Sequence, residues 1–181
     1  QRGEDDGQFI WALSIATHPD GRIFVCDEWL NRITIFSREG KFLNKWGQNG
    51  SRNGELNGPA GLVVESDGNL LVADGENHRI QRFTPDGQFI ATWGSFGTGD
   101  GQLNYPWGIT TDQLGNVYVA DWRNDRIQKF TSAGKFLLTF GSSGTANGEF
   151  NRPTGVAVDK DGDIYVTDWG NKRVQIFGSD G

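Results

Sequence analysis

The segment 119–130 places five side chains capable of chemistry directly after an apolar stretch. They are Asp121, Arg123, Asn124, Asp125 and Arg126. Carboxylates beside an amide and arginines can bind a cation, transfer a proton or hold a phosphate group. The rest of the chain helps to choose between these chemistries, because related segments occur at residues 25–36, 72–83 and 166–177.

The four segments recur with a constant period of 47 residues, and each has an aspartate followed five positions later by an arginine. The pairs are Asp27 and Arg32, Asp74 and Arg79, Asp121 and Arg126, and Asp168 and Arg173. Residues that every repeat shares are expected to stabilise the scaffold rather than one ligand site. We therefore expect each aspartate to accept hydrogen bonds from the turn amides that follow it. Each arginine is expected to pair with that aspartate or with the neighbouring repeat.

Each repeat contains four strand signals separated by glycine turns. In the third repeat these signals cover residues 107–112, 116–121, 126–131 and 135–140. The second of them is apolar almost throughout, which predicts a strand that is covered on both faces. Turns containing Asp-Gly predict two-residue hairpin loops. A period of this length with four strands per unit is typical of a propeller blade.

The sequence NRPTGVAVDKDGDIYVTDWGNKRVQIF at residues 151–177 resembles an NHL repeat. The resemblance covers essentially the whole chain and implies an all-β protein, a β-propeller of four 47-residue blades. The blades are expected at about 1–47, 48–94, 95–141 and 142–181, the last without its outer strand. The first repeat departs most from the pattern, because Ala12 and Ser14 replace the proline and glycine of the others.

Positions that differ between repeats are candidates for ligand contacts. The connection entering the first strand and the turn after the repeated aspartate are expected on one face of the propeller. The candidate binding residues there are Glu28, Trp29, Glu76, Trp107, Trp122, Arg123 and Trp169. Exposed tryptophan beside charged groups is typical of a binding surface, although these rings could instead pack against neighbouring loops. Trp46 and Trp93 share a fourth-strand position with Phe140 and are expected to be core anchors.

These features favour a non-enzymatic binding or scaffold module for a protein, a peptide or a glycan. The resemblance leaves open an NHL-type lyase or hydrolase whose metal site is completed by residues absent from this chain. RNA binding is disfavoured, because 23 acidic residues oppose 17 basic ones for a net charge of −6. No cofactor or metal is predicted, since His18 and His78 are expected on opposite faces. The lone cysteine, Cys26, is expected inside a strand as a small buried residue.

The longest apolar stretch, FIWALSIA at residues 9–16, is too short to span a membrane as a helix. The chain shows no targeting segment, so we expect a soluble protein without membrane insertion and assign no compartment. A last blade without its outer strand predicts an exposed edge and an apolar end face. We therefore expect a fragment or half of a larger ring, with two copies forming an eight-bladed homodimer.

Overall fold

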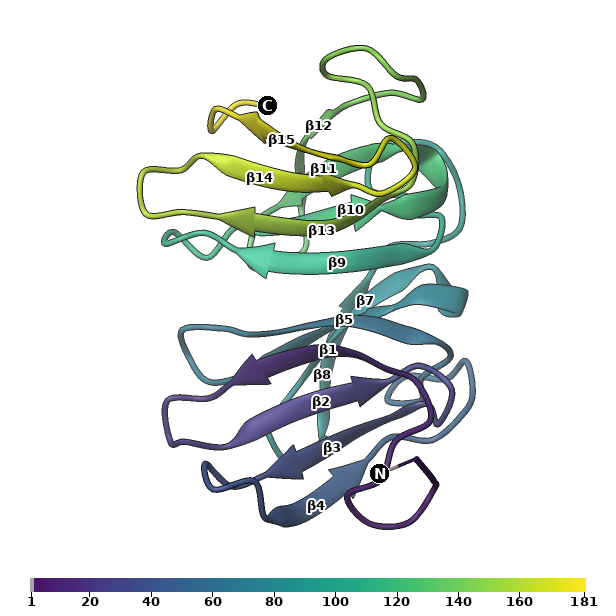
Figure 1. Cartoon of the computed structure of the whole chain (residues 1–181), viewed down its shortest axis with the longest axis vertical. Coiled ribbons are helices and arrows are strands. Elements are labelled where there is room, and N and C mark those ends of the chain that lie inside the picture. The colour runs from purple at the N-terminus through teal and green to yellow at the C-terminus, as the bar shows by residue number, and fades with distance from the viewer. Residues whose placement is uncertain (1) are drawn as a thin grey trace.

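A computed structural model describes residues 2–181 and leaves Gln1 outside the described part. The protein is an all-β, four-bladed β-propeller, and each blade is an antiparallel sheet formed by consecutive segments of the chain (Figure 1). The fold class predicted from the repeat is therefore confirmed.

The first blade contains β1 (Ala12–Thr17), β2 (Ile23–Asp27), β3 (Arg32–Phe36) and β4 (Phe42–Trp46). The second contains β5 (Pro59–Val64), β6 (Leu70–Asp74), β7 (Arg79–Phe83) and β8 (Phe89–Trp93). The third contains β9 (Pro106–Thr111), β10 (Val117–Asp121), β11 (Arg126–Phe130) and β12 (Phe136–Phe140). The fourth contains β13 (Pro153–Val158), β14 (Ile164–Asp168) and β15 (Arg173–Phe177).

Two short 3-10 turns, η1 (Gly75–Asn77) and η2 (Trp122–Asn124), are the helical elements of residues 2–181. Neither approaches the length and apolarity that a membrane-crossing helix needs, and residues 2–181 contain no other candidate.

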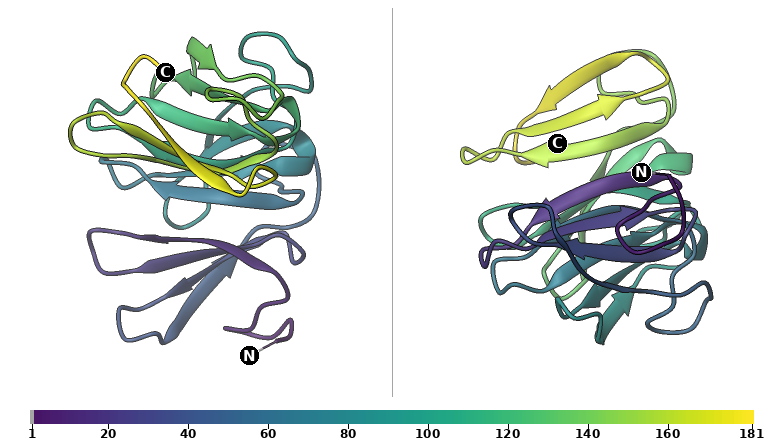
Figure 2. Two further views of the ribbon diagram at one scale, coloured as in Figure 1. Left: turned by 45° about the horizontal axis from the view of Figure 1, so that its top comes forward. Right: turned by 60° about the horizontal axis from the view of Figure 1, so that its bottom comes forward.

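The blades lie side by side in chain order, with the first and the last at the two ends (Figures 1 and 2). Their inner strands β1, β5, β9 and β13 contact one another in that order. These strands line an axial hollow of about 330 Å³, with Leu13, Ala60, Trp107 and Thr154 among its walls. The four residues predicted to lie nearest the central axis are thus brought together.

The hydrophobic core lies between the blades. Phe24 and Ile33 of the first blade pack with Leu62, Val72 and Phe83 of the second in one buried cluster. Every residue of β6 and β10 is buried, as the uninterrupted apolar pattern of these strands predicts.

The aromatic residue that ends each outer strand packs on the following blade. The ring of Trp46 lies 4.8 Å from the ring of Phe83, centroid to centroid, and Trp93 and Phe140 occupy the same position at the next two junctions. Trp46 also covers Gly87, where φ is +86° and a Cβ would overlap the indole. These rings are therefore core anchors, as predicted.

The hairpin turns between the first and second strands differ from the two-residue loops predicted from Asp-Gly. In the second blade, where the turn contains Asp67-Gly68, Glu65 N–H donates to the carbonyl of Asn69 (2.8 Å), and Gly68 N–H donates to the carbonyl of Glu65 (2.9 Å). Three residues therefore separate the paired positions, and Gly68 has a φ of +87°. The glycine is required, but by a three-residue loop in which it follows a tight turn.

Candidate functional site

The repeated aspartate is fully buried in all four blades and organises the loops at one end of the strands. In the third blade, Asp121 Oδ2 accepts hydrogen bonds from Asn124 Nδ2 (2.8 Å), Arg126 Nε (2.8 Å) and Gln128 Nε2 (3.1 Å). The second and fourth blades repeat this arrangement with Asp74 and Asp168. The segment that raised the question of chemistry is therefore a buried hydrogen-bond network that stabilises the fold.

One detail of the predicted network is wrong for three blades. The backbone amide that reaches the aspartate belongs to the connector before the inner strand, as Asn104 N–H shows with Asp121 Oδ1 (2.7 Å). The arginine fixes the same connector, because the Arg126 guanidinium also donates to the carbonyls of Thr98, Gly99 and Gln102. The network therefore joins each connector to its own blade.

The first blade lacks two members of this network, because Leu30 and Thr34 stand where the others have asparagine and glutamine. Asp27 Oδ1 accepts instead from the amides of Trp29 (3.1 Å) and Leu30 (3.0 Å), as predicted from the sequence. Within residues 2–181, buried Arg32 Nε and Thr34 Oγ1 have no hydrogen-bond partner. The departure of the first repeat thus has a local energetic cost.

A second set of hydrogen bonds ties each loop to the next blade. Asn31, His78 and Asp125 have φ values of 52°, 55° and 53°, and their side chains accept an amide from the following blade. His78 Nδ1, for example, accepts from Tyr105 N–H (3.1 Å), which requires an unprotonated Nδ1. Burial, opposed by the Glu76 carboxylate, lowers the pKa of His78 and favours the neutral ring.

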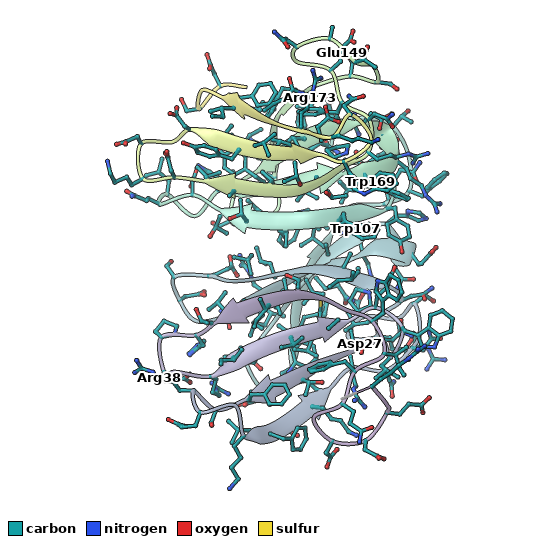
Figure 3. All side chains as sticks on the ribbon, in the orientation of Figure 1. Asp27, Arg38, Trp107, Glu149, Trp169 and Arg173 are labelled. Carbon is teal, nitrogen blue, oxygen red and sulfur yellow. The ribbon has the colours of Figure 1, made fainter. Side chains whose placement is uncertain are left out.

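These two networks build what we call the loop face. It consists of the connections entering β1, β5, β9 and β13 and the turns after the repeated aspartates. Figure 3 shows Asp27, Trp107 and Trp169 toward this side of the molecule and Arg38 toward the other.

An aromatic cluster of Tyr105, Trp107 and Trp122 lies on the loop face. The centroid of the Trp107 ring is 5.7 Å from that of Tyr105 and 5.4 Å from that of Trp122. The Tyr105 hydroxyl donates to Glu28 Oε1 (2.5 Å), so the ring reaches from the third blade to the first. Burial, together with the carboxylates of Glu28 and Glu76, raises the pKa of Tyr105 and keeps it a donor.

Two guanidinium groups lie over the aromatic cluster. Arg152 is 4.6 Å from the Trp122 ring centroid, and Arg123 is 4.9 Å from that of Tyr105. Neither side chain forms a salt bridge with a carboxylate of residues 2–181. Cation–π contacts position the two guanidinium groups, and their positive charges remain available to an anionic group of a ligand.

The structure brings four of the seven predicted binding residues together through Tyr105. They are Glu28, Trp107, Trp122 and Arg123. Glu76 is exposed beside them. Trp29 is 72% exposed and Trp169 is 67% exposed, whereas Trp107 and Trp122 are half-buried and pack on neighbouring loops. The alternative that the rings pack against neighbouring loops therefore applies to Trp107 and Trp122. Of the predicted tryptophans, Trp29 and Trp169 have the exposed indoles.

Sequence reasoning missed Tyr105 and Arg152. Both precede the first strand of a blade, at the position that Trp11 and Gly58 occupy in the other repeats. Four different residue types at one repeat position are the same signal of variability that identified the other candidates. The candidate positions predicted from the sequence follow the proline and the repeated aspartate, whereas this position precedes the proline.

The residues that suggested other chemistries are dispersed. Among residues 2–181, no three His, Cys, Asp or Glu side chains gather so as to hold a metal ion. Cys26 is buried, its Sγ lies 3.4 Å from the carbonyl oxygen of Ala60, and burial raises its pKa to about 12. A thiol in this state is a poor nucleophile.

The NHL repeat family model matches residues 56–83, 103–130 and 150–177. The chain is an NHL-repeat protein. The first repeat falls outside the matched residues, in keeping with its incomplete hydrogen-bond network. A segment of 63 residues is 36% identical to the RING finger protein nhl-1 of Caenorhabditis elegans, covering 35% of this chain and 6% of that protein.

Solved structures share the fold of this NHL-repeat chain at low sequence identity. A Bacteroides thetaiotaomicron protein of unknown function has a TM-score of 0.79 and 18% identity, covering 92% of this chain and 47% of its own. A streptogramin B lyase structure has a TM-score of 0.70 and 16% identity, covering 98% of this chain and 56% of its own. A catalytically inactive virginiamycin B lyase from Staphylococcus aureus, with quinupristin, has a TM-score of 0.67 and 21% identity, covering 93% and 55%. The NHL-repeat chain therefore spans about half the length of these structures, and the likeness shows the fold alone.

Proposed function

We propose that this NHL-repeat propeller is a non-enzymatic binding module that holds a protein, a peptide or a glycan on its loop face. One observation carries the proposal: Trp29 and Trp169 expose 72% and 67% of their surface on a face that also presents unpaired charges. An exposed indole supplies a large contact area and one hydrogen-bond donor, which suits it to recognition.

The charges of the loop face support an oriented ligand. The carboxylates of Glu28 and Glu76 lie on the first two blades, and the cationic groups of Arg123, Arg152 and Lys172 lie on the last two. A ligand with a basic and an acidic end would therefore bind in one direction across the aromatic cluster.

A peptide and glycan array probed with the intact chain tests this proposal. The double variant Trp29→Ala/Trp169→Ala should lose at least about tenfold in affinity for the ligands that the wild type binds. Leu114→Ala is the matched control, since this residue is 87% exposed in a hairpin turn at the opposite ends of the strands. Equal binding by the wild type and the double variant would refute the assignment of this face.

A lyase or hydrolase is the second candidate, favoured by the fold likeness to the streptogramin B and virginiamycin B lyases. Elemental analysis of the purified chain distinguishes it from a binding module. Zinc or calcium at one equivalent per chain would favour the enzyme, because such a lyase would use a bound metal to polarise its substrate.

Self-association through the two end faces completes the proposal. Val174 of the last blade is 60% exposed, whereas Ile33, Ile80 and Ile127 at the same repeat position are 0% exposed. Ile15 of the first blade is 66% exposed, and its second-blade equivalent is buried. The uncovered surfaces are thus the two halves of the junction that the chain forms three times internally, and a second copy offers the complementary half.

A further inference from the structure

A hollow of about 340 Å³ lies on the loop face between the first two blades. Its walls include Glu28, Trp29, Gly58, Glu76 and Tyr105. We infer that this hollow binds a cationic side chain of the ligand, an arginine or lysine. The inference rests on the proposed function and adds the chemistry and position of one contact.

Gly58 has no side chain, and Glu76 and Tyr105 lie close over it: a Cβ there would be 3.1 Å from Glu76 Cγ and 3.5 Å from the Tyr105 hydroxyl oxygen. Its repeat position carries Tyr105 in the third blade and Arg152 in the fourth, with φ values of 59° at both and 62° at Gly58. The backbone conformation is therefore the same, and a large residue is tolerated elsewhere. At the first junction, the absence of a side chain lets Tyr105 and Glu76 approach Gly58 and form walls of the hollow.

The hydrogen bonds of the loops hold the walls of the hollow in place. Asn31 Oδ1 accepts from Gly58 N–H (2.8 Å), and Asn31 Nδ2 donates to the carbonyl of Trp29 (3.2 Å). On the other side, Gly58 accepts from Gly75 N–H (3.1 Å), which fixes the turn that carries Glu76. The site is built by the fold before any ligand arrives, which lowers the cost of binding.

The chemistry of the walls selects a positive charge. Within residues 2–181, no hydrogen bond or ion pair reaches Glu28 Oε2 or the side chain of Glu76. The Tyr105 hydroxyl already donates to Glu28 Oε1, so it holds that carboxylate against the hollow. Exposed Trp29 adds an aromatic face on which a guanidinium or ammonium group can stack.

Two small probes test the charge preference directly. N-acetyl-arginine methylamide and its neutral citrulline counterpart would be titrated, to about 20 mM, into the intact chain while the Trp29 indole N–H is followed by NMR. The arginine probe should shift this resonance and saturate, and the citrulline probe should bind at least about tenfold more weakly. Equal affinities, or no shift with arginine, would overturn the inference.

Variants then place the probe in the hollow. Glu28→Gln removes one wall carboxylate but keeps an oxygen that can accept from the Tyr105 hydroxyl, so the melting temperature should stay within a few degrees while affinity for the arginine probe falls about tenfold. Glu76→Gln should also weaken the arginine probe, whereas Glu39→Gln, the same change in an exposed turn at the other ends of the strands, should not. Undiminished binding by both Glu28→Gln and Glu76→Gln would refute the site.

The array of the preceding subsection separates this inference from the proposed function. If array ligands bind through Trp29 and Trp169 but the arginine probe does not bind in the hollow, only the cation site is refuted. If the array ligands do not depend on Trp29 and Trp169 and the arginine probe does not bind either, the loop face is refuted as a binding surface.

Discussion

At the scale of single residues, the chain separates scaffold from surface by repetition. Aspartate and arginine occur in every blade, and the fully buried aspartates accept hydrogen bonds from the arginines in the last three blades. The exception is informative: the first blade keeps both residues and loses two of their partners, so its Arg32 Nε is buried without a hydrogen bond. A shared motif therefore guarantees the position of a side chain only when its partners are shared as well.

Restoring those partners should stabilise the protein. The double variant Leu30→Asn/Thr34→Gln gives Asp27 and Arg32 the neighbours found in the other blades, and we expect a gain of about 1–2 kcal/mol in the free energy of unfolding. Urea denaturation measures it. The reverse variant in the second blade, Asn77→Leu/Gln81→Thr, should lose at least as much unfolding free energy. A more stable second-blade variant, or a less stable first-blade variant, would contradict the stabilising role of the network.

His78 should make stability depend on pH. Its pKa is lowered in the folded state, so the unfolded state binds more protons between that value and about 6.5. The neutral ring therefore contributes fully to the free energy of unfolding above about pH 6.5, and this contribution is lost as the pH falls through the pKa of the folded state. His78→Asn keeps an acceptor, as Asn31 does one blade earlier, and cannot titrate. Its melting temperature should fall less than that of the wild type between pH 7 and pH 5; parallel curves would refute the prediction.

At the scale of elements, the blade junction is the repeated unit of stability. Each junction combines apolar strands packed face to face with one aromatic ring from the outer strand of the preceding blade. Loops on the loop face contribute hydrogen bonds to the same junctions, so a change in a loop can alter the packing of two blades.

Two tryptophan variants distinguish the core anchors from the surface indoles. Trp46→Ala removes the ring that packs on Phe83 and should cost about 3 kcal/mol of unfolding free energy. Trp169→Ala removes an indole that is 67% exposed and should change stability by less than about 0.5 kcal/mol. Chemical denaturation of both variants is the measurement, and similar losses would show that Trp169 is structural.

At the scale of the whole molecule, two apolar end faces stay uncovered. Ile15 lies on the first blade, and Val174 and Ile176 lie on the last, exposed by 66%, 60% and 63%. Their equivalents at an internal junction, Leu62, Ile33 and Ile35, are at most 4% exposed. Exposed surface of this kind favours association, and the proposed head-to-tail pair of chains would cover it by repeating a junction that already exists.

Light scattering should therefore report a mass near 40 kDa, twice the 20.0 kDa of one chain. Val174→Asp places a charge in the proposed junction and should yield a folded monomer, while Leu114→Asp, on an exposed hairpin turn, should remain a dimer. A wild-type chain that is monomeric at all accessible concentrations would exclude this association.

The sequence alone determined the blade, its strands and its scaffold residues. These follow from local rules: alternation and apolar runs predict strands, glycine marks the turns, and a constant period places each element in every blade. In the third blade, predicted and observed strand ends differ by about one residue. The hairpin loops were misjudged because Asp-Gly occurs in turns of two and of three residues.

Only the tertiary structure decided how the loop face is composed. Tyr105 reaches Glu28, 77 positions away in the chain, because Gly58 and Gly75 of the intervening blade leave room for its ring. No local pattern encodes that contact, because it depends on the distance between the first and third blades, which the second blade separates. The same packing half-buries Trp107 and Trp122 and leaves Trp29 and Trp169 exposed. Repetition thus specifies what each blade is, and the packing of blades specifies which of its variable residues a ligand can meet.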